Sequence, residues 1–298
     1  QQRSVIFSIC TDPDVLTRVE WLACYLTTGK HLGLYTSVFT VLLLLAITAP
    51  TALLFGFAGA SAARSQVFPI RLLGQAYIAV VRGVPDIVFF LFFIIALDQA
   101  LEWVRHETLC PDWSENIRQG ADFIVCQEAK LPQSDSPQWM HDIYSFCLAV
   151  VTFAIVFGAF ASNVLLGAML AVPHAQVETG EAYGMSRRQT FWRIIIPQMW
   201  VYALPGLSNL WIVLIKSTPL LFLLGIEDIV YWARELGGTK LSRFSDYPHG
   251  DWRMWYFLAL LVFYLAFTKI SEMVLDRLMK KLTFGQATVG GAQQQEAA

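Results

Sequence analysis

The stretch "VETGEAYGMSRRQTFWRIIIPQ", residues 177–198, is a polar segment that lies between two long apolar runs. Its pattern predicts two short helices. Gly184 supplies the left-handed backbone position at which a first helix ends. Ser186, with Gln189 three residues later, forms a capping box that starts a second helix, and Pro197 is expected to end it. The segment is therefore predicted to fold as helix, glycine bend, helix.

The chain around this segment is too apolar for an ordinary soluble domain. Of its 298 residues, 56% are hydrophobic and 15% are charged, the formal net charge is -2, and the mean hydropathy is +0.51. Runs of roughly 20 mostly apolar residues are long enough to cross a bilayer as helices. They lack the alternating pattern of a membrane β-barrel. We expect an all-α integral membrane protein with about five transmembrane helices, formed by residues 33–60, 77–97, 143–172, 199–226 and 252–270.

An odd number of spans places the two chain ends on opposite sides of the membrane. Lys and Arg are about equally dense on both sets of loops, so the positive-inside rule hardly discriminates between the two orientations. Arg277, Lys280 and Lys281 directly follow the last span and favour a cytoplasmic C-terminus. The predicted parts are an extracytoplasmic segment (1–32), a transmembrane domain (33–282), an acidic extracytoplasmic insert (98–142), a cytoplasmic loop (173–198) and a disordered C-terminal tail (283–298).

Charged residues inside the spans have two interpretations, because an ionisable group in hydrocarbon is costly unless it is paired or lines a wet cavity. Arg82 and Asp86, four residues apart, either pair on one helix or leave Arg82 facing a path for solute. Lys216 is a second candidate for such a path. Prolines in these spans either kink helices or break them at a binding site; they are Pro85, Pro205 and Pro219.

Small polar residues in the fourth span leave the same choice open. Ser208, Asn209, Ser217 and Thr218 either line a path or form hydrogen bonds between helices.

Two of the five cysteines, Cys110 and Cys126, share the long polar insert. A disulfide between them and two unpaired thiols are both compatible with the sequence, and oxidation is favoured if the insert is extracytoplasmic. Their spacing matches no metal-binding motif. No phosphate-binding Gly-x-x-x-x-Gly-Lys-(Ser or Thr) loop and no basic face with interleaved aromatics occur, so neither ATPase activity nor a nucleic-acid partner is expected.

The quoted segment resembles the EAA loop of permease subunits from ATP-binding-cassette importers. In that loop Glu-Ala-Ala is followed by three residues, Gly, nine residues, Ile, any residue, Leu and Pro. Here Glu178, Gly184 and Ile194 keep this spacing, as do Glu181-Ala182 and Ile196-Pro197. From its residues alone, the segment is either a connecting loop that lies on the lipid headgroups, with its arginines reaching lipid phosphate, or a docking knob for a soluble partner. The similarity favours the second and identifies residues 173–198 as a coupling loop of this type.

Some positions depart from the family pattern. Thr179, Gly180 and Ile196 replace the two Ala and the Leu. Gly180 disfavours a helix by about 1 kcal/mol relative to Ala, which predicts a softer first helix. Asn163 and Leu166 stand where the family usually has an acidic residue and an arginine, so the role of that pair is not carried over.

Two further motifs are similar to the polar amino-acid branch of this family. Arg82-Gly83-Val84-Pro85 resembles its Arg-Gly-Thr-Pro, and Lys216-Ser217-Thr218-Pro219 resembles its Lys-(Asp or Ser)-Thr-Ser. The resemblance covers residues 33–97 and 143–282, and the three motifs occur in the order of the family.

The resemblance implies a membrane-spanning permease of a polar amino-acid importer, type I, in a bacterial inner membrane, for a polar amino acid or a related compound. The implied partners are two cytoplasmic ATPase subunits, a second permease of the same or a related chain, an extracytoplasmic solute-binding protein and membrane lipid. No cofactor is implied for this chain, because the ATPase subunits bind the ATP. The implied coupling residues are Glu178, Glu181, Ala182, Gly184, Ser186 and Pro197. The candidate path residues, chosen because they are polar or charged within the spans, are Arg82, Asn209, Lys216, Ser217 and Thr218.

Two other functions fit the same composition. An ion-gradient-driven transporter needs an acid inside the membrane, and Asp86 is its best candidate. An accessory membrane subunit needs no path for a solute. The interrupted fourth span argues against this alternative.

Overall fold

The computed structural model describes residues 10, 16–113, 117–119, 122–224, 226–243 and 245–283. Within these residues, five helices are long and apolar enough to cross a membrane, as the five apolar runs predicted. Their bounds are Gly29–Ala63, Ile87–Leu109, Gln138–Ala171, Arg187–Phe222 and Arg253–Lys281. The predicted tail, 283–298, lies outside the described residues apart from its first position.

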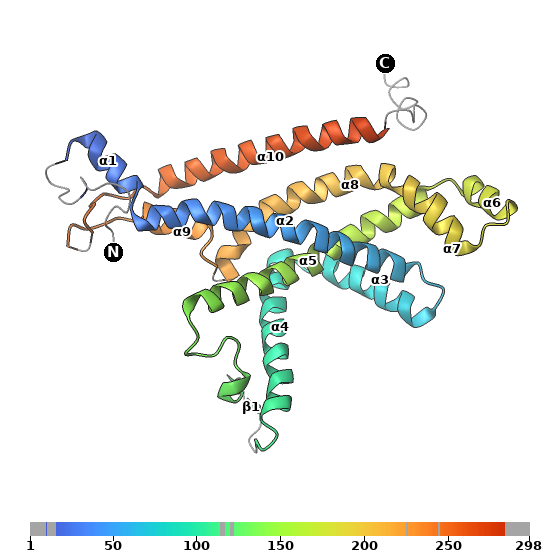
Figure 1. Cartoon of the computed structure of the whole chain (residues 1–298), viewed down its shortest axis with the longest axis horizontal. Helices are drawn as coiled ribbons and strands as arrows, with labels where there is room; N and C mark the ends of the chain where they lie inside the picture. The colour runs from blue at the N-terminus through green and yellow to red at the C-terminus, as the bar shows by residue number, and fades with distance from the viewer. Residues whose placement is uncertain are drawn as a thin grey trace. The chain divides into compact units, whose positions relative to one another are not determined.

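The chain divides into two compact units. Unit 1 comprises Gln1–Thr48, Pro85–Phe153 and Ser217–Tyr264, and unit 2 comprises Ala49–Val84, Ala154–Lys216 and Leu265–Ala298. The division falls inside three long helices, so each of them contributes to both units: α2 (Gly29–Ala63), α5 (Gln138–Ala171) and α10 (Arg253–Thr283) (Figure 1).

Unit 1 contains α1 (Arg18–Leu26), α4 (Asp86–Leu109), a 3-10 segment (Thr218–Leu224) and α9 (Ile229–Gly237). Side-chain caps explain where two of these helices begin. Thr17 and Glu20 form a capping box at the start of α1. At the start of α9, Oδ1 of Asp228 accepts the backbone N–H groups of Val230 and Tyr231. The Asp228 carboxyl is fully buried, and this burial raises its pKa to about 6.

A buried hydrogen-bond chain ties the N-terminal segment to the start of α10. The hydroxyl of Tyr25 lies 3.0 Å from Nε2 of His249 and 3.0 Å from the hydroxyl of Tyr256. The Tyr256 hydroxyl in turn lies 2.7 Å from Nε2 of His31. A disulfide between Cys10 and Cys24 anchors the same segment. The sequence did not predict this hydrogen-bond chain, because Tyr25 and His31 lie more than 200 residues from His249 and Tyr256.

Ion pairs hold α9 to the start of α2. Nζ of Lys30 donates to Oε1 of Glu235 at 2.8 Å, and Nζ of Lys240 donates to the same oxygen at 3.0 Å. The hydrogen bond from Lys30 has the largest effect on the pKa of the Glu235 carboxyl, and together with the one from Lys240 it holds that pKa below its usual range. The indole of Trp232 also lies against Gly33, where an added Cβ would come within 2.7 Å of the ring.

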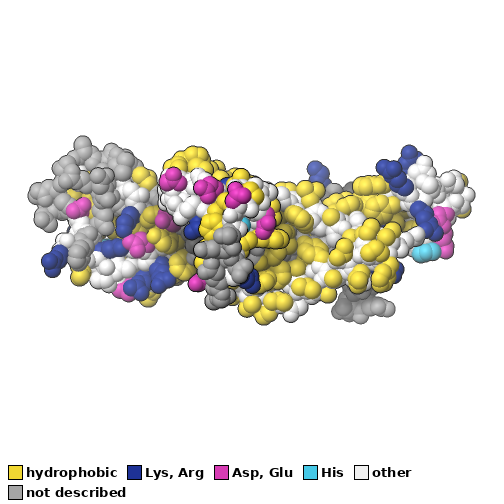
Figure 2. Space-filling model, turned by 90° about the horizontal axis from the view of Figure 1, so that it is seen from below, with side chains coloured by type: hydrophobic (Ala, Val, Ile, Leu, Met, Phe, Trp, Pro, Cys, Tyr) yellow, Lys and Arg dark blue, Asp and Glu magenta, His cyan; other side chains and the backbone are white. Residues whose placement is uncertain are grey.

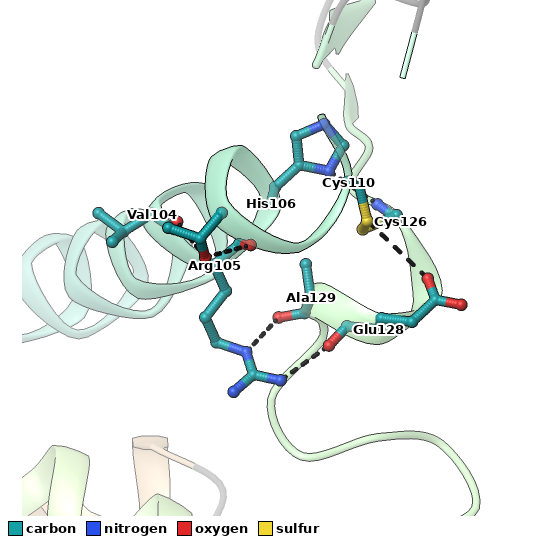
Figure 3. Close-up of a disulfide and its surroundings, with 8 residues drawn as sticks. Val104, Arg105, His106, Cys110, Cys126, Glu128 and Ala129 are labelled. Atoms are coloured by element: carbon teal, nitrogen blue, oxygen red, sulfur yellow. Dashed lines mark hydrogen bonds between the residues drawn. A yellow bond between two sulfur atoms is a disulfide. The ribbon is translucent and has the colours of Figure 1, made fainter. Parts of the chain in front are cut away.

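The insert after α4 is closed by a disulfide. Cys110 and Cys126 are bonded, with their Cα atoms 6.7 Å apart, so the paired alternative is the one that this structure contains (Figure 3). Nδ1 of His106 accepts the N–H of Cys126, and the Arg105 guanidinium donates to the carbonyl oxygens of Glu128 and Ala129. Both cysteine sulfurs are consumed in the disulfide, which leaves no thiolate for a metal beside His106.

The insert also contains two short strands. Strands β1 (Arg118–Gln119) and β2 (Asp122–Phe123) form a short antiparallel pair.

Unit 2 contains α3 (Phe68–Gly83), α6 (His174–Ala182), α7 (Arg187–Thr190), a π-helical turn (Phe191–Ile195) and α8 (Ile196–Ser217) up to Lys216. Small residues let its helices approach closely, since an added Cβ at Gly74 would clash with the backbone of α2 at Ala62 and Ala63. Its buried core joins α2, α5 and α8 through Ala60, Leu165, Met169, Met199 and Ala203.

The apolar run 77–97 is not one helix, contrary to the sequence prediction. α3 ends at Gly83 and α4 begins at Asp86, and Val84 between them is extended with φ -109° and ψ 142°. The ring of Pro85 disfavours a helical conformation in the residue before it, which explains the break. Arg82 and Asp86 therefore lie on different helices, and their predicted ion pair falls outside the described side chains. The second span instead extends to Leu109, into the predicted insert.

The surface agrees with a membrane location. Figure 2 shows hydrophobic side chains over much of the face in view, and charged side chains are seen around α6 and α7 in unit 2 and on parts of unit 1. On α3, for example, Leu73 is 71% exposed and Val80 is 57% exposed. Lipid can cover such side chains without the cost of exposing them to water.

Candidate functional site

The coupling loop folds as the predicted helix, glycine bend and helix. α6 begins after Pro173, which serves as its N-cap residue, and the chain turns at Gly184 with φ +78°. The N–H of Met185 donates to the carbonyl oxygen of Gly180 at 3.0 Å, and that of Gly184 to Glu181 at 2.9 Å. This pair of bonds is the Schellman arrangement that closes a helix C-terminus. We call residues 173–197 the elbow.

The second helix of the elbow starts at the predicted capping box. The N–H of Ser186 donates to Oε1 of Gln189 at 2.9 Å, and the N–H of Gln189 donates to Oγ of Ser186 at 3.4 Å. Both hydrogen bonds satisfy backbone donors that a helix N-terminus otherwise leaves free.

The prediction that Pro197 ends this helix is wrong. α7, the π-helical turn and α8 follow one another without a break, and Pro197 is the second residue of α8. Proline lacks a backbone N–H and crowds the carbonyl four residues earlier, here that of Arg193. Arg193 lies in the π-helical turn, whose hydrogen bonds join residues five apart, so the wider turn accommodates the ring. The elbow is therefore continuous with a transmembrane helix.

The two arms of the elbow are in direct contact. Gly180 on α6 is buried, and an added Cβ there would lie 2.5 Å from Cδ1 of Ile194 in the π-helical turn. Glycine at position 180 thus permits a close approach between the two arms. The sequence predicted only a softer helix at this position and did not predict this contact.

The acidic side chains of the elbow differ in their surroundings. Oε1 of Glu178 accepts a hydrogen bond from Nδ1 of His174 at 3.0 Å, and the two side chains are 66% and 82% exposed. Tyr183, at the tip, is 84% exposed. These side chains are free to contact another protein.

Glu181 faces a pocket at the base of the elbow. The pocket has a volume of about 450 Å³ and is lined by Glu181, Arg64, Arg187 and Thr190, among others. The Arg64 guanidinium lies 5.8 Å from the centre of the Phe191 ring, in cation-π range.

Two of the predicted path residues share one face of α8. Asn209 and Lys216 are seven residues apart and exposed, as is Pro205 on the same face. Met199, Ala203 and Leu214 on the other side of α8 are buried. No carboxylate lies within ion-pair distance of Lys216 among the residues that the structure describes. This polar stripe on α8 is uncovered in the single chain.

The other predicted path residues lie elsewhere. Arg82 is exposed at the last turn of α3, whereas Ser217 and Thr218 belong to unit 1. The hydroxyl of Thr218 is fully buried and lies 2.9 Å from that of Tyr264. This contact favours a role for Thr218 in holding helices together. A role in the path stays a prediction for all five residues.

Sequence reasoning missed a polar face at the start of α5. Gln138, His141, Asp142 and Ser145 line one pocket of unit 1. Their spacing, with gaps of three, one and three residues, is the signal of one helix face, and it could have been read from the sequence.

Comparisons with known proteins agree with this architecture. A family model described as "Binding-protein-dependent transport system inner membrane component" matches residues 52–284. The arginine ABC transporter permease protein ArtQ of Escherichia coli strain K12 is 31% identical over 216 residues, covering 72% of this chain and 80% of ArtQ. The histidine/lysine/arginine/ornithine transport system permease protein HisQ of Salmonella typhimurium is 32% identical over 235 residues, covering 78% and 86% of the two chains.

Solved structures show the same fold. An amino acid ABC transporter crystallised with histidines matches with a TM-score of 0.56 at 20% identity, covering 88% of this chain and 99% of the other. The MetNI methionine ABC transporter in an inward-facing conformation matches with a TM-score of 0.54 at 12% identity, covering 84% and 94%.

Proposed function

The chain belongs to the family of binding-protein-dependent transport system inner membrane components, and from this premise we propose that it forms the translocation path for a polar amino acid or a related compound. Its family and its five apolar helices make it a multi-pass protein of the inner membrane. The names of ArtQ and HisQ support an amino acid as the transported compound.

The observation that carries the proposal is the continuity of the elbow with α8. Residues 187–216 form one uninterrupted helix within unit 2, with a length of about 45 Å at 1.5 Å per residue. The capping box and the contact between Gly180 and Ile194 hold the elbow in one shape. A force on the elbow is thereby transmitted along α8 to the stripe that carries Asn209 and Lys216.

ATP binding and hydrolysis belong to separate subunits under this proposal. Two cytoplasmic ATPase subunits dock on the elbow, with Glu178, Glu181 and Ala182 at the contact and Gly184, Ser186 and Pro197 shaping it. When the ATPase dimer closes, the elbows move together, and the movement of α8 makes the cavity open to the other side of the membrane. The permease needs no cofactor of its own and makes no covalent bond with its substrate.

The remaining partners follow from the same family. A second permease, identical or related, covers the stripe on α8 and completes the path. The elbow and the C-terminus face the cytoplasm, and the N-terminus, the disulfide-closed insert and residues 227–251 face outward. Two disulfides on that side support this orientation, because oxidation is favoured outside the cytoplasm. A solute-binding protein delivers the substrate to this outer face.

Uptake into proteoliposomes tests the proposal. The complex purified from its native membrane is reconstituted with its solute-binding protein, and uptake of labelled amino acids is followed with ATP, without ATP, and with an imposed proton or sodium gradient alone. The proposal predicts uptake that requires ATP. Uptake driven by a gradient without ATP would overturn it.

A further inference from the structure

Unit 1 contains a polar pocket that none of the predicted path residues lines. It has a volume of about 470 Å³ and is formed by α2, α5 and the segment that leads into α9. Pockets of roughly 300–1,000 Å³ are typical of small-molecule sites. Its lining residues on these two helices fall within the first 12 residues of α2 and the first nine of α5, so the pocket lies toward the N-terminal ends of both.

Hydroxyl groups on α2 present only acceptors to this pocket. The hydroxyl of Thr36 donates to the carbonyl oxygen of Gly33 at 3.0 Å, that of Ser37 to Leu34 at 2.7 Å, and that of Thr40 to Thr36 at 3.4 Å. Each hydroxyl hydrogen is therefore used within the helix, and the oxygen lone pairs stay available to a ligand. Ser37 is only 3% exposed, so its oxygen lies deep in the wall.

The charge of the pocket is negative. Asp142 and Glu227, both exposed, line it together with His141, and no Lys or Arg does. Nε2 of Gln138 donates to Oδ1 of Asp142 at 3.0 Å, which orients that carboxylate. Among the described residues, no cation lies within ion-pair distance of either carboxylate. The site therefore offers two uncompensated negative charges to a ligand.

An aromatic wall completes the pocket. The indole of Trp232 is held against α2, because Gly33 leaves no Cβ in its way. A fixed indole ring attracts a cation to its face.

We propose that this pocket binds the cationic side chain of a basic amino acid, an ammonium or a guanidinium, as the substrate enters the permease. A guanidinium carries five N–H donors and no acceptor, which matches a site of carboxylates and hydroxyl lone pairs. The inference rests on the proposed function and adds selectivity for positive charge to it. It assigns Asp142 and Glu227 to binding and Trp232 to the wall beside them.

The test is equilibrium binding to the purified permease and ATPase complex in nanodiscs, without a solute-binding protein. Labelled L-arginine is the probe, and L-glutamine and L-glutamate are competitors. The double variant Asp142→Asn, Glu227→Gln is compared with Glu107→Gln, which removes a carboxylate from an exposed position of α4 outside the pocket. We expect arginine to bind about 10-fold or more weakly to the double variant, because it loses charge-assisted contacts. Glu107→Gln should bind arginine as the normal complex does.

A second variant distinguishes a loss of binding from a loss of folding. Thr40→Val removes one acceptor at unchanged charge and is expected to weaken arginine binding about 3-fold while leaving the amount of assembled complex unchanged. Equal arginine affinity in the normal complex and the double variant would overturn the inference, as would preference of the normal complex for glutamine over arginine. If ATP still drives uptake of a neutral amino acid in that case, the proposed function stands. Absence of ATP-driven uptake of any amino acid would overturn both.

Discussion

Gly180 and Ile194 meet across the elbow, at a distance that leaves no room for a side chain on residue 180. A methyl group added there would lie 2.5 Å from Cδ1 of Ile194. The contact joins α6 to the helix that continues as α8, so it lies on the route along which we propose that the elbow transmits force. The following variants test this geometry and its neighbours.

The contact between Gly180 and Ile194 predicts that substitutions at the two positions are not additive. Gly180→Ala gains about 1 kcal/mol in helix propensity but clashes with Cδ1 of Ile194. Ile194→Val removes that atom. We expect Gly180→Ala to be more favourable in the Ile194→Val background by about 1 kcal/mol, measured as thermal stability of all four proteins. Strict additivity would show that the two residues do not touch.

Gly184 is predicted to tolerate Asn better than Ala. Its φ of +78° disfavours a residue with a Cβ by about 1–2 kcal/mol, and Asn adopts this conformation more readily than Ala. No atom lies within 4 Å of an added Cβ, so backbone strain alone is tested. Gly167→Ala, in open space on α5 with an ordinary φ, serves as the matched control and should not destabilise. Equal melting temperatures for Gly184→Ala and Gly184→Asn would contradict the geometry.

The buried carboxyl of Asp228 is expected to make the stability difference between Asp228→Asn and the normal protein depend on pH. Burial raises the pKa of its carboxyl from 3.8 to about 6, so the folded chain holds this proton more tightly than the unfolded chain. The resulting stabilisation is present below pH 4 and is lost as the pH rises through 6. Asp228→Asn keeps the oxygen that caps α9 but carries no charge. Its melting temperature relative to the normal protein should therefore rise between pH 5 and pH 8. A difference that is constant over this range would refute the prediction.

Lys216 is predicted to act in transport without contributing to assembly. It is exposed on the polar stripe of α8, and the described residues give it no ionic partner. Lys216→Ala should lower ATP-dependent uptake about 10-fold, equivalent to about 1.4 kcal/mol, with the complex still purified intact. Lys280 is an exposed lysine near the end of α10, and Lys280→Ala should transport normally. Normal uptake kinetics in Lys216→Ala would remove this residue from the path.

Much of the fold was predictable because membrane spans and caps are local signals. Four of the five apolar runs contain most of a helix that is long enough to cross a bilayer, and the run 77–97 overlaps the first half of the fifth, Ile87–Leu109. Gly184 and the pair of Ser186 and Gln189 also determine the bend and the next helix start within a few residues. Such features depend on neighbours along the chain and not on distant contacts.

The errors have different physical causes. Pro85 breaks a helix inside an apolar run, whereas Pro197 is accommodated by the π-helical turn before it. Hydropathy cannot separate these outcomes, because both depend on how neighbouring carbonyl groups are satisfied. The approach of Ile194 to Gly180 and the pairing of Cys10 with Cys24 arise from tertiary packing. The polar face of α5 could have been recognised from the spacing of its residues in the sequence. It was missed because it lies at the edge of a span predicted to be apolar.

The central claim, that the elbow is where the ATPase docks, is tested most directly by co-purification. The tagged chain is purified in mild detergent from its native membrane beside Glu178→Lys, which reverses an exposed charge on α6, and Glu107→Lys, which does the same on α4. Mass spectrometry then measures the amount of ATPase subunit per permease. We predict that the ATPase accompanies the normal chain and Glu107→Lys and is lost from Glu178→Lys. Equal ATPase retention by all three proteins, or no ATPase with any of them, would contradict the claim.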